Sequence, residues 1–208
     1  MKAILDACCG GREMWFNKHH DAALYIDIRK EGPGIRKERP SFEVNPDVIM
    51  DFRAMDFPDK TFKLVVWDPP HLATLGATSI YRKKYGCLNA QTWQSDLSKG
   101  FSECWRVLDD YGVLIFKWCD QEIPLKKLLE LFGQQPLFGH NTGSNSKTYW
   151  VTFMKFPEPS TEPAKECIAP PGWADSLNDS TGNRKGGVSC PTNQSDELTQ
   201  VTSPEASK

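Results

Sequence analysis

The chain has 208 residues and a formal net charge of −2. Residues 1–157 contain 21 basic and 19 acidic residues, whereas residues 158–208 contain 4 and 8. The balance in the first part excludes a strongly basic nucleic-acid binder, although local basic clusters can still contact phosphates. No run approaches the roughly 18 apolar residues of a membrane-spanning helix, and the N-terminus lacks a signal-peptide core. We therefore expect a soluble, cytoplasmic protein without a membrane partner.

Composition divides the chain near Pro157. Before this position the sequence is rich in aliphatic and aromatic residues, whereas Pro, Ser, Thr, Asn and charged residues prevail from Glu158 onward. Such a polar segment buries too little apolar surface to offset the entropy lost on ordering. We predict one domain over residues 1–157 and a disordered polar tail over residues 158–208.

Short apolar runs bounded by Gly, Pro or acidic residues predict buried parallel strands. They lie at residues 3–5, 22–26, 48–50, 62–67 and 113–116. Helical patterns lie between several of these runs, with apolar residues on one face of 92–108 and of 121–132. Strands that alternate with helices predict an α/β protein with a doubly wound sheet and helices on both faces. Segments 135–139 and 149–156 flank a turn-rich stretch and predict a C-terminal antiparallel hairpin.

The first predicted strand leads into a turn with two adjacent glycines and two adjacent cysteines. Its residues are Asp6, Ala7, Cys8, Cys9, Gly10 and Gly11. Glycines between a strand and a following helix let backbone N–H groups approach a ligand, although a plain turn is the alternative. The turn has neither G-x-G-x-x-G nor the P-loop Gly-Lys-Ser/Thr, which argues against a dinucleotide or a nucleoside triphosphate.

Acidic residues also follow the second and third strands. Asp27, with Ile28 beside it, lies about 20 residues beyond the glycine turn, where an acid in a nucleotide-binding sheet accepts hydrogen bonds from ribose. After the third strand, Asp51 and Phe52 could take the amino group and the face of an adenine. A capping Asp beside a core Phe explains this second pair equally well.

The fourth strand stops at Asp68-Pro69-Pro70-His71. The prolines fix an acidic side chain and a backbone carbonyl at the carboxyl edge of the sheet, where open α/β sheets bind ligands. The Asp68 carboxylate and the Pro69 carbonyl can accept both N–H groups of an aryl amine and stabilise the positive charge that develops on its nitrogen. His71 can stack on the ring. In the alternative reading, Pro-Pro only ends the strand and Asp68 caps it.

About eighteen residues separate His71 from the next helix, a length typical of lids and binding loops. Tyr81, Arg82, Lys83 and Lys84 mix aromatic and basic groups, as surfaces that stack on bases and contact phosphates do. An ordinary solvated loop is the alternative. Lys117 and Trp118, at the end of the fifth strand, should face the same rim as substrate contacts.

The seven cysteines include no C-x-x-C pair, and His19-His20 has no partner at ligand spacing, so we expect no metal. In this order the segments resemble the class I S-adenosylmethionine-dependent methyltransferases over roughly residues 3–156. Asp6 to Gly11 resembles their cofactor loop, and Asp27 resembles their ribose acid. The resemblance implies a Rossmann-like, mostly parallel sheet with a reversed C-terminal hairpin, and S-adenosyl-L-methionine as the methyl donor.

Within that class, D-P-P-H is similar to the (D/N/S)-P-P-(Y/F/W) signature of enzymes that methylate exocyclic amines of adenine or cytosine. The whole run resembles small phage and bacterial methyltransferases of unassigned target. This resemblance implies methyl transfer to adenine N6 or cytosine N4 in DNA or RNA. Because His71 departs from the signature, a methyltransferase of small molecules or proteins and a cofactor-binding subunit of a larger methyltransferase stay open. No segment resembles a target-recognition region, so a protein partner for target recognition also stays open.

Overall fold

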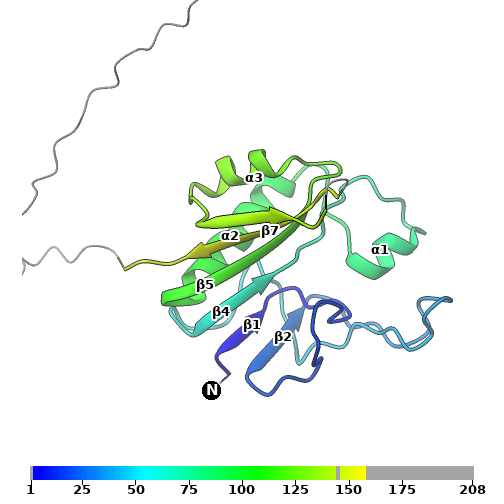
Figure 1. The fold of residues 1–208 in the computed structure, drawn as a ribbon. Coiled ribbons are helices and arrows are strands. Elements are labelled where there is room, and N and C mark those ends of the chain that lie inside the picture. Colours follow the sequence, from blue (N-terminus) through cyan, green and yellow to red (C-terminus); the bar gives the residue numbers. More distant parts are fainter. Residues whose placement is uncertain (1, 144–145, 158–208) are drawn as a thin grey trace, which may run out of the picture. The chain divides into compact units, whose positions relative to one another are not determined.

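A computed structural model describes residues 2–143 and 146–157. Their seven strands form one sheet in the order β3-β2-β1-β4-β5-β7-β6 (Figure 1). The strands are β1 (Ile4–Asp6), β2 (Ala23–Asp27), β3 (Val48–Ile49), β4 (Phe62–Trp67), β5 (Leu108–Cys119), β6 (Phe138–Asn141) and β7 (Thr148–Met154). The tail predicted over residues 158–208 lies outside the described residues and stays a prediction.

The first five strands pair in parallel, and β7 runs antiparallel to both β5 and β6. The chain moves outward from β1 to β3 and then returns to β4 on the other side of β1. This reversal of strand order creates a switch point between β1 and β4, where open sheets bind ligands at the carboxyl ends of their strands. The predicted Rossmann-like, mostly parallel sheet with a reversed C-terminal hairpin is confirmed.

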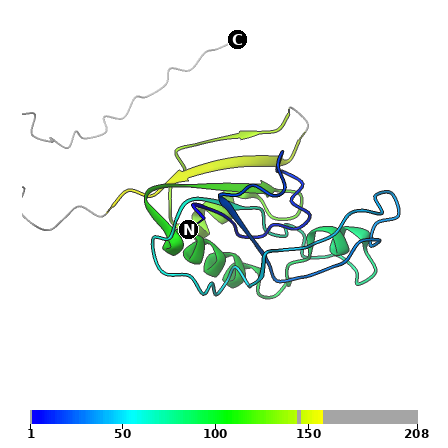
Figure 2. The ribbon, with the colours of Figure 1, turned by 90° about the horizontal axis from the view of Figure 1, so that it is seen from below.

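Helices α2 (Trp93–Val107) and α3 (Leu125–Phe132) pack against each other, and α2 also contacts β4 and β5. Figure 2 shows α2, in green, on one side of the sheet. Alternate residues of β5 point into this layer, and three of them, Leu114, Phe116 and Trp118, are fully buried. The ring of Phe101 on α2 stacks on Phe132 of α3 with 4.3 Å between centroids. This face holds the main hydrophobic core.

Turns, not a helix, follow β1. Residues 7–22 contain no helix, and Arg12 has a left-handed backbone with φ of 52°. The segment is short and rich in aromatic residues, Asn and His, which have low helix propensity. The side chain of Trp15 packs beside the buried Ala23 and Tyr25, in a cluster separate from the main core. These turns take the place of the helix that was expected directly after the glycine turn.

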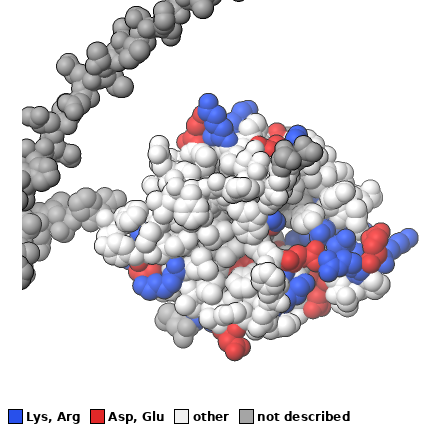
Figure 3. Space-filling model, viewed as in Figure 1, with Lys and Arg blue, Asp and Glu red and all other residues white. Residues whose placement is uncertain are grey.

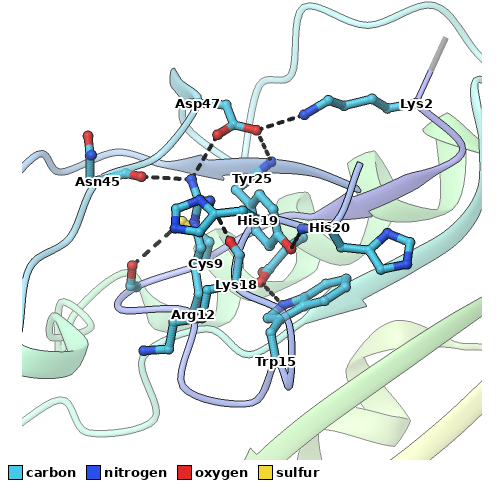
Figure 4. Close-up of polar contacts among 12 residues, drawn as sticks. Lys2, Cys9, Arg12, Trp15, Lys18, His19, His20, Tyr25, Asn45 and Asp47 are labelled. Carbon is cyan, nitrogen blue, oxygen red and sulfur yellow. Dashed lines mark hydrogen bonds and ion pairs between the residues drawn. The ribbon is translucent and has the colours of Figure 1, made fainter. Parts of the chain in front are cut away.

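Arg12 fastens these turns to the sheet and to the connection between β2 and β3. Its buried guanidinium lies 3.8 Å from the centroid of the Tyr25 ring. The same group donates hydrogen bonds to the Lys18 and Asn45 carbonyls at 2.7 and 2.8 Å. It also donates to the Asp47 carboxylate at 2.8 Å (Figure 4). We call these five residues the Arg12 clasp.

Helix α1 (Ile80–Tyr85) lies beyond the carboxyl ends of the parallel strands (Figure 1). It is short, polar and contains no buried residue. Sequence patterns predicted a loop here, because six residues are too few to display a helical period. Of the helices in the described residues, none is both long and apolar enough to cross a membrane.

Candidate functional site

Two cavities adjoin at the carboxyl edge of the sheet. The glycine-turn cavity, of about 250 Å³, lies against the turn after β1, and the His71 cavity, of about 540 Å³, lies against the residues after β4. Asp68, Tyr85 and Lys117 line both cavities. The switch point is therefore hollow, and Asp68 is part of the wall that the two cavities share.

The glycine turn is shaped by its backbone. The Ala7 and Cys9 N–H groups donate to carbonyls of β4 and β2, each at 2.9 Å. At Gly11 an added Cβ would lie 2.4 Å from the Phe42 ring, so a side chain fits there only if that ring moves. Cys8, Cys9, Gly10 and Gly11 line the glycine-turn cavity, as the sequence predicted for a ligand loop. Ala7 is buried behind them.

Asp6 lies behind this cavity rather than in its wall. The side chain is fully buried, and its carboxylate accepts hydrogen bonds from Trp15 Nε1 at 2.7 Å and from the Cys8 N–H at 3.3 Å. Burial raises the pKa of Asp6 to about 7, because these two bonds only partly offset the loss of solvation and the negative charges of Asp68 and Asp27 lie nearby. Asp6 therefore titrates near neutral pH.

Asp27 is also buried, and both of its carboxylate oxygens are already engaged. One oxygen accepts the Gly10 N–H at 3.0 Å, and the other accepts the Arg29 N–H at 2.9 Å and its Nε at 3.2 Å. Asp27 and Ile28 line neither cavity, whereas Arg29 lines the glycine-turn cavity. Asp27 thus holds the glycine turn in shape from behind, instead of presenting a free carboxylate.

Asp51 and Phe52 are not brought to either cavity. Burial alone would raise the pKa of Asp51, but hydrogen bonds from Arg53 outweigh it and lower that pKa. Phe52 packs edge-on against Trp67, with 5.6 Å between ring centroids, and belongs to the main core. Of the alternative reading, a capping Asp beside a core Phe, the core Phe is found; Asp51 accepts the Arg53 N–H at 2.9 Å and pairs with the Arg53 side chain.

Asp68 follows β4 directly and accepts a hydrogen bond from the Lys117 ammonium at 2.6 Å. Burial raises the pKa of Asp68, and the charge of Lys117 is the largest influence that opposes this rise. Pro69 lines the His71 cavity. Pro70 packs against Gly86 just after α1, where an added Cβ would lie 3.0 Å from Pro70 Cγ and the backbone φ is +80°. The D-P-P-H segment is thus buttressed by α1.

His71 stands between two aromatic rings, Tyr85 of α1 at 6.1 Å and Trp118 of β5 at 6.3 Å between centroids. Burial lowers the pKa of His71 despite the nearby carboxylate of Asp68 and so favours the neutral imidazole. Trp118 itself is fully buried, and its Nε1 donates to the Ile123 carbonyl. Consecutive strand residues point to opposite faces, so Lys117 reaches the cavities and Trp118 faces the core.

The residues of α1 differ in which cavity they line. Tyr81 lines the His71 cavity, and Lys84 lines the glycine-turn cavity. Lys84 also pairs with Glu13 of the glycine-turn region at 3.1 Å. Arg82 and Lys83 are exposed and line neither cavity. Figure 3 shows basic and acidic residues mixed on this side of the molecule, without a continuous positive surface.

Several cavity residues were not predicted as site residues. They are Glu13, Met14, Arg29, Phe42 and Trp150 around the glycine turn, and Leu72, Leu75, Cys119, Gln121, Glu122 and Thr148 around His71. Trp150 faces Lys117 in the β5–β7 register. The sequence predicted the hairpin that contains Trp150. It could not predict that Trp150 lies opposite Lys117, because the pairing register does not follow from the sequence pattern alone. The described residues contain no group of three or more His, Cys, Asp or Glu suited to a metal.

The fold and these cavities define a Rossmann-like α/β protein with two adjoining cavities at its switch point. No protein-family model and no curated protein matches the sequence. Solved structures with a similar fold include the PH0226 protein of Pyrococcus horikoshii OT3, which is 17% identical with a TM-score of 0.47, the match covering 73% of this chain and 81% of that one. With a TM-score this low, the likeness carries no argument about chemistry.

Two further structures are described as methyltransferases. A TehB-like SAM-dependent methyltransferase of Corynebacterium glutamicum is 15% identical, with a TM-score of 0.44 and coverage of 74% of this chain and 79% of that one. The 1,6-didemethyltoxoflavin-N1-methyltransferase of Burkholderia thailandensis, solved with S-adenosylhomocysteine, is 12% identical, with a TM-score of 0.45 and coverage of 74% and 71%.

Proposed function

We propose that this chain is an S-adenosyl-L-methionine-dependent methyltransferase that modifies an exocyclic amine of a nucleobase, adenine N6 or cytosine N4, in DNA or RNA. The observation that carries the proposal is Asp68, which lines two adjoining cavities at the carboxyl end of β4. Group transfer between two molecules needs a site for each and a common wall where the reacting atoms can be aligned.

The walls of the glycine-turn cavity suit the donor. Glu13 supplies negative charge for its cationic groups, and the rings of Tyr85 and Trp150 suit a sulfonium through cation–π attraction. The three basic side chains in this wall are each within 3.2 Å of a carboxylate, so they add little net repulsion. When bound, S-adenosyl-L-methionine supplies a methyl group on a sulfonium sulfur.

Asp68 and Pro69 bind the acceptor amine in this proposal. The second carboxylate oxygen of Asp68 and the carbonyl of Pro69 accept no hydrogen bond from any described residue. An exocyclic amine carries two N–H groups, which these two oxygens can accept. Accepting both bonds stabilises the positive charge that develops as the nitrogen forms its fourth bond. Asp68 is then placed to receive the proton that this nitrogen must lose.

The nucleic-acid part of the proposal rests on α1. Tyr81 is 58% exposed at the His71 cavity, and Arg82 and Lys83 are exposed beside it. An aromatic ring with adjacent basic groups suits a single-stranded or extruded nucleotide, since the ring stacks on bases and the cations contact phosphates. Extruding a base from a duplex costs a few kcal/mol, which a looped or single-stranded target avoids.

A methyltransferase of small molecules or proteins is the second candidate. The His71 cavity, of about 540 Å³, is within the usual range for small ligands, and the surface charge around α1 is of both signs. Salt separates the two candidates. Nucleic-acid binding should weaken steeply between low and moderate salt, whereas the binding of a neutral metabolite should not.

The test uses methyl-labelled S-adenosyl-L-methionine with the purified full chain and, separately, unmethylated DNA and bulk RNA. Digestion to nucleosides and mass spectrometry should find label on an adenine or cytosine amine. Asp68→Asn should lower the rate at least about 100-fold and keep donor affinity, measured by calorimetry, within a few fold, because the residue contacts the acceptor.

Asp56→Asn, at an exposed carboxylate away from the cavities, is the matched control and should retain the full rate. If Asp68→Asn lost donor binding to the same extent as activity, Asp68 would belong to the donor site instead. Label in neither polymer, with donor binding intact, would favour a small-molecule or protein acceptor. Methylation by the chain alone would exclude the third candidate, a cofactor-binding subunit that needs a partner.

A further inference from the structure

The contact between Lys117 and Asp68 joins two neighbouring strands at the point where the cavities meet. Trp67 pairs with Phe116 in the β4–β5 register, so the next residues, Asp68 and Lys117, lie side by side at the carboxyl edge. The ammonium of Lys117 lies 2.6 Å from one Asp68 oxygen. On its other side it lies 5.8 Å from the centroid of the Trp150 ring, which β7 holds opposite in register.

We infer that Lys117 is a positioning residue, which holds one carboxylate oxygen of Asp68 and leaves the other, with the Pro69 carbonyl, for the two N–H groups of the acceptor amine. This inference rests on the proposed function and replaces the expectation that Lys117 contacts the substrate. Two acceptor atoms then match two donors, and the carboxylate cannot rotate to pair both of its oxygens elsewhere.

The charge of Lys117 has a second consequence for Asp68. A protonated carboxyl group donates through its O–H and is a poorer acceptor for an amine. Burial drives Asp68 towards this protonated form, and the adjacent ammonium opposes it. Titratable and charged groups face Asp68 from the elements around the two cavities. They are Asp6 of β1, Cys8 and Glu13 of the glycine-turn region, Arg29 after β2, His71 of the same loop, Tyr81, Lys84 and Tyr85 of α1, Lys117 and Cys119 of β5, and Glu122 after β5. Of the cations among them, Lys117 is the one in direct contact.

The experiment compares the full chain with its Lys117→Met and Lys117→Arg variants. Carbon-13 NMR of labelled aspartate carboxyl groups follows the titration of Asp68, whose signal is identified by its loss in Asp68→Asn. We expect Lys117→Met to raise the titration midpoint of Asp68 by about one pH unit or more, and Lys117→Arg to keep it close to the wild-type value. Lys117→Gln takes the place of the Met variant if that variant does not fold.

The pH dependence of kcat/KM provides the functional readout. In Lys117→Met the acidic limb should move to higher pH by the same interval, so that the rate falls about tenfold or more on that limb and recovers at higher pH. A change that only removed a structural contact would lower the rate equally at every pH. Lys63→Met is the matched control, because Lys63 pairs with Asp109 at 2.6 Å away from the cavities.

An unchanged midpoint of Asp68 in Lys117→Met would overturn the inference, as would a uniform loss of rate without a shifted limb. The NMR titration needs no substrate. If no nucleic acid is methylated but the midpoint still rises, the proposed function fails and the pairing of Lys117 with Asp68 stands. If methylation occurs and the midpoint does not move, only the positioning role fails.

Discussion

Asp6 is the residue whose environment makes the clearest prediction about pH. Its pKa is raised to about 7 in the folded chain, against about 3.9 in an unfolded one. Between these values the folded state keeps a proton that the unfolded state releases, so this residue makes the protein less stable as pH rises from about 4 to 7. Above pH 7 the penalty is complete, and the pKa difference sets it at up to about 4 kcal/mol.

Asp6→Asn removes the titrating group and keeps its shape. The variant should therefore gain unfolding free energy relative to wild type as pH rises from about 4 to 7, measured by urea unfolding at a series of pH values. Asn cannot accept both present hydrogen bonds, so a constant offset is expected at every pH, and the slope of the difference is the readout. Parallel curves for the two proteins would mean that the pKa of Asp6 is not raised in the folded state.

At the same scale, whether a site residue could be predicted from the sequence depended on whether another side chain of the protein pairs with it. The sequence predicted Asp68 at a strand end because the two prolines after it end the strand locally, independently of the rest of the fold. It could not predict that the Arg53 side chain hydrogen-bonds to the Asp51 carboxylate, or the Arg29 side chain to the Asp27 carboxylate. Each of these bonds depends on the conformation of a loop. Lys117 was expected at the rim, but its contact with Asp68 depends on the register of β4 and β5.

At the scale of elements, the turns after β1 depend on one side chain. Arg12→Met removes the charge-assisted bonds and the ring contact of the Arg12 clasp and leaves the Asp47 carboxylate short of one partner. We expect a loss of about 2–4 kcal/mol of unfolding free energy, measured by denaturant titration. Donor affinity should fall as well, because the same turns carry Gly10 and Gly11.

Arg82→Met is the control for this prediction, since Arg82 is an exposed arginine on α1. Its unfolding free energy should stay within about 0.5 kcal/mol of wild type. Equal effects of the two substitutions would mean that Arg12 contributes no more than a surface arginine.

Elements with a clear pattern of apolar residues were predicted well. The apolar face of 92–108 and the aliphatic runs of β1, β2 and β4 correspond to elements found in the structure. Elements fixed by single contacts were missed: residues 12–22 form turns around Arg12, and α1 has no apolar face from which to be predicted. β5 is also longer than the predicted 113–116, because pairing with β4 at Phe62 and Leu108 extends it past two acidic residues.

At the scale of the whole molecule, the mostly parallel sheet with its reversed C-terminal hairpin followed from the alternation of strands and helices together with the resemblance, whereas the order of its strands did not. The division of the buried residues into two clusters did not follow either. The main cluster joins α2 and α3 to the middle of the sheet, and the smaller cluster holds Cys9, Ala23 and Tyr25. We keep the single domain over residues 1–157 as a proposal.

The two unequal clusters have a consequence for local opening of the fold. Backbone amides of β4, β5 and β7, which share the larger cluster, should exchange with deuterated water most slowly, and those of β2 and β3 should exchange sooner. The edge of the sheet at β2 and β3 would then open without the strands around Asp68, to which β1 is joined through Leu5. S-adenosyl-L-methionine, if it binds as proposed, should slow exchange mainly in the glycine turn and at this edge, and mass spectrometry of peptic fragments would locate the change.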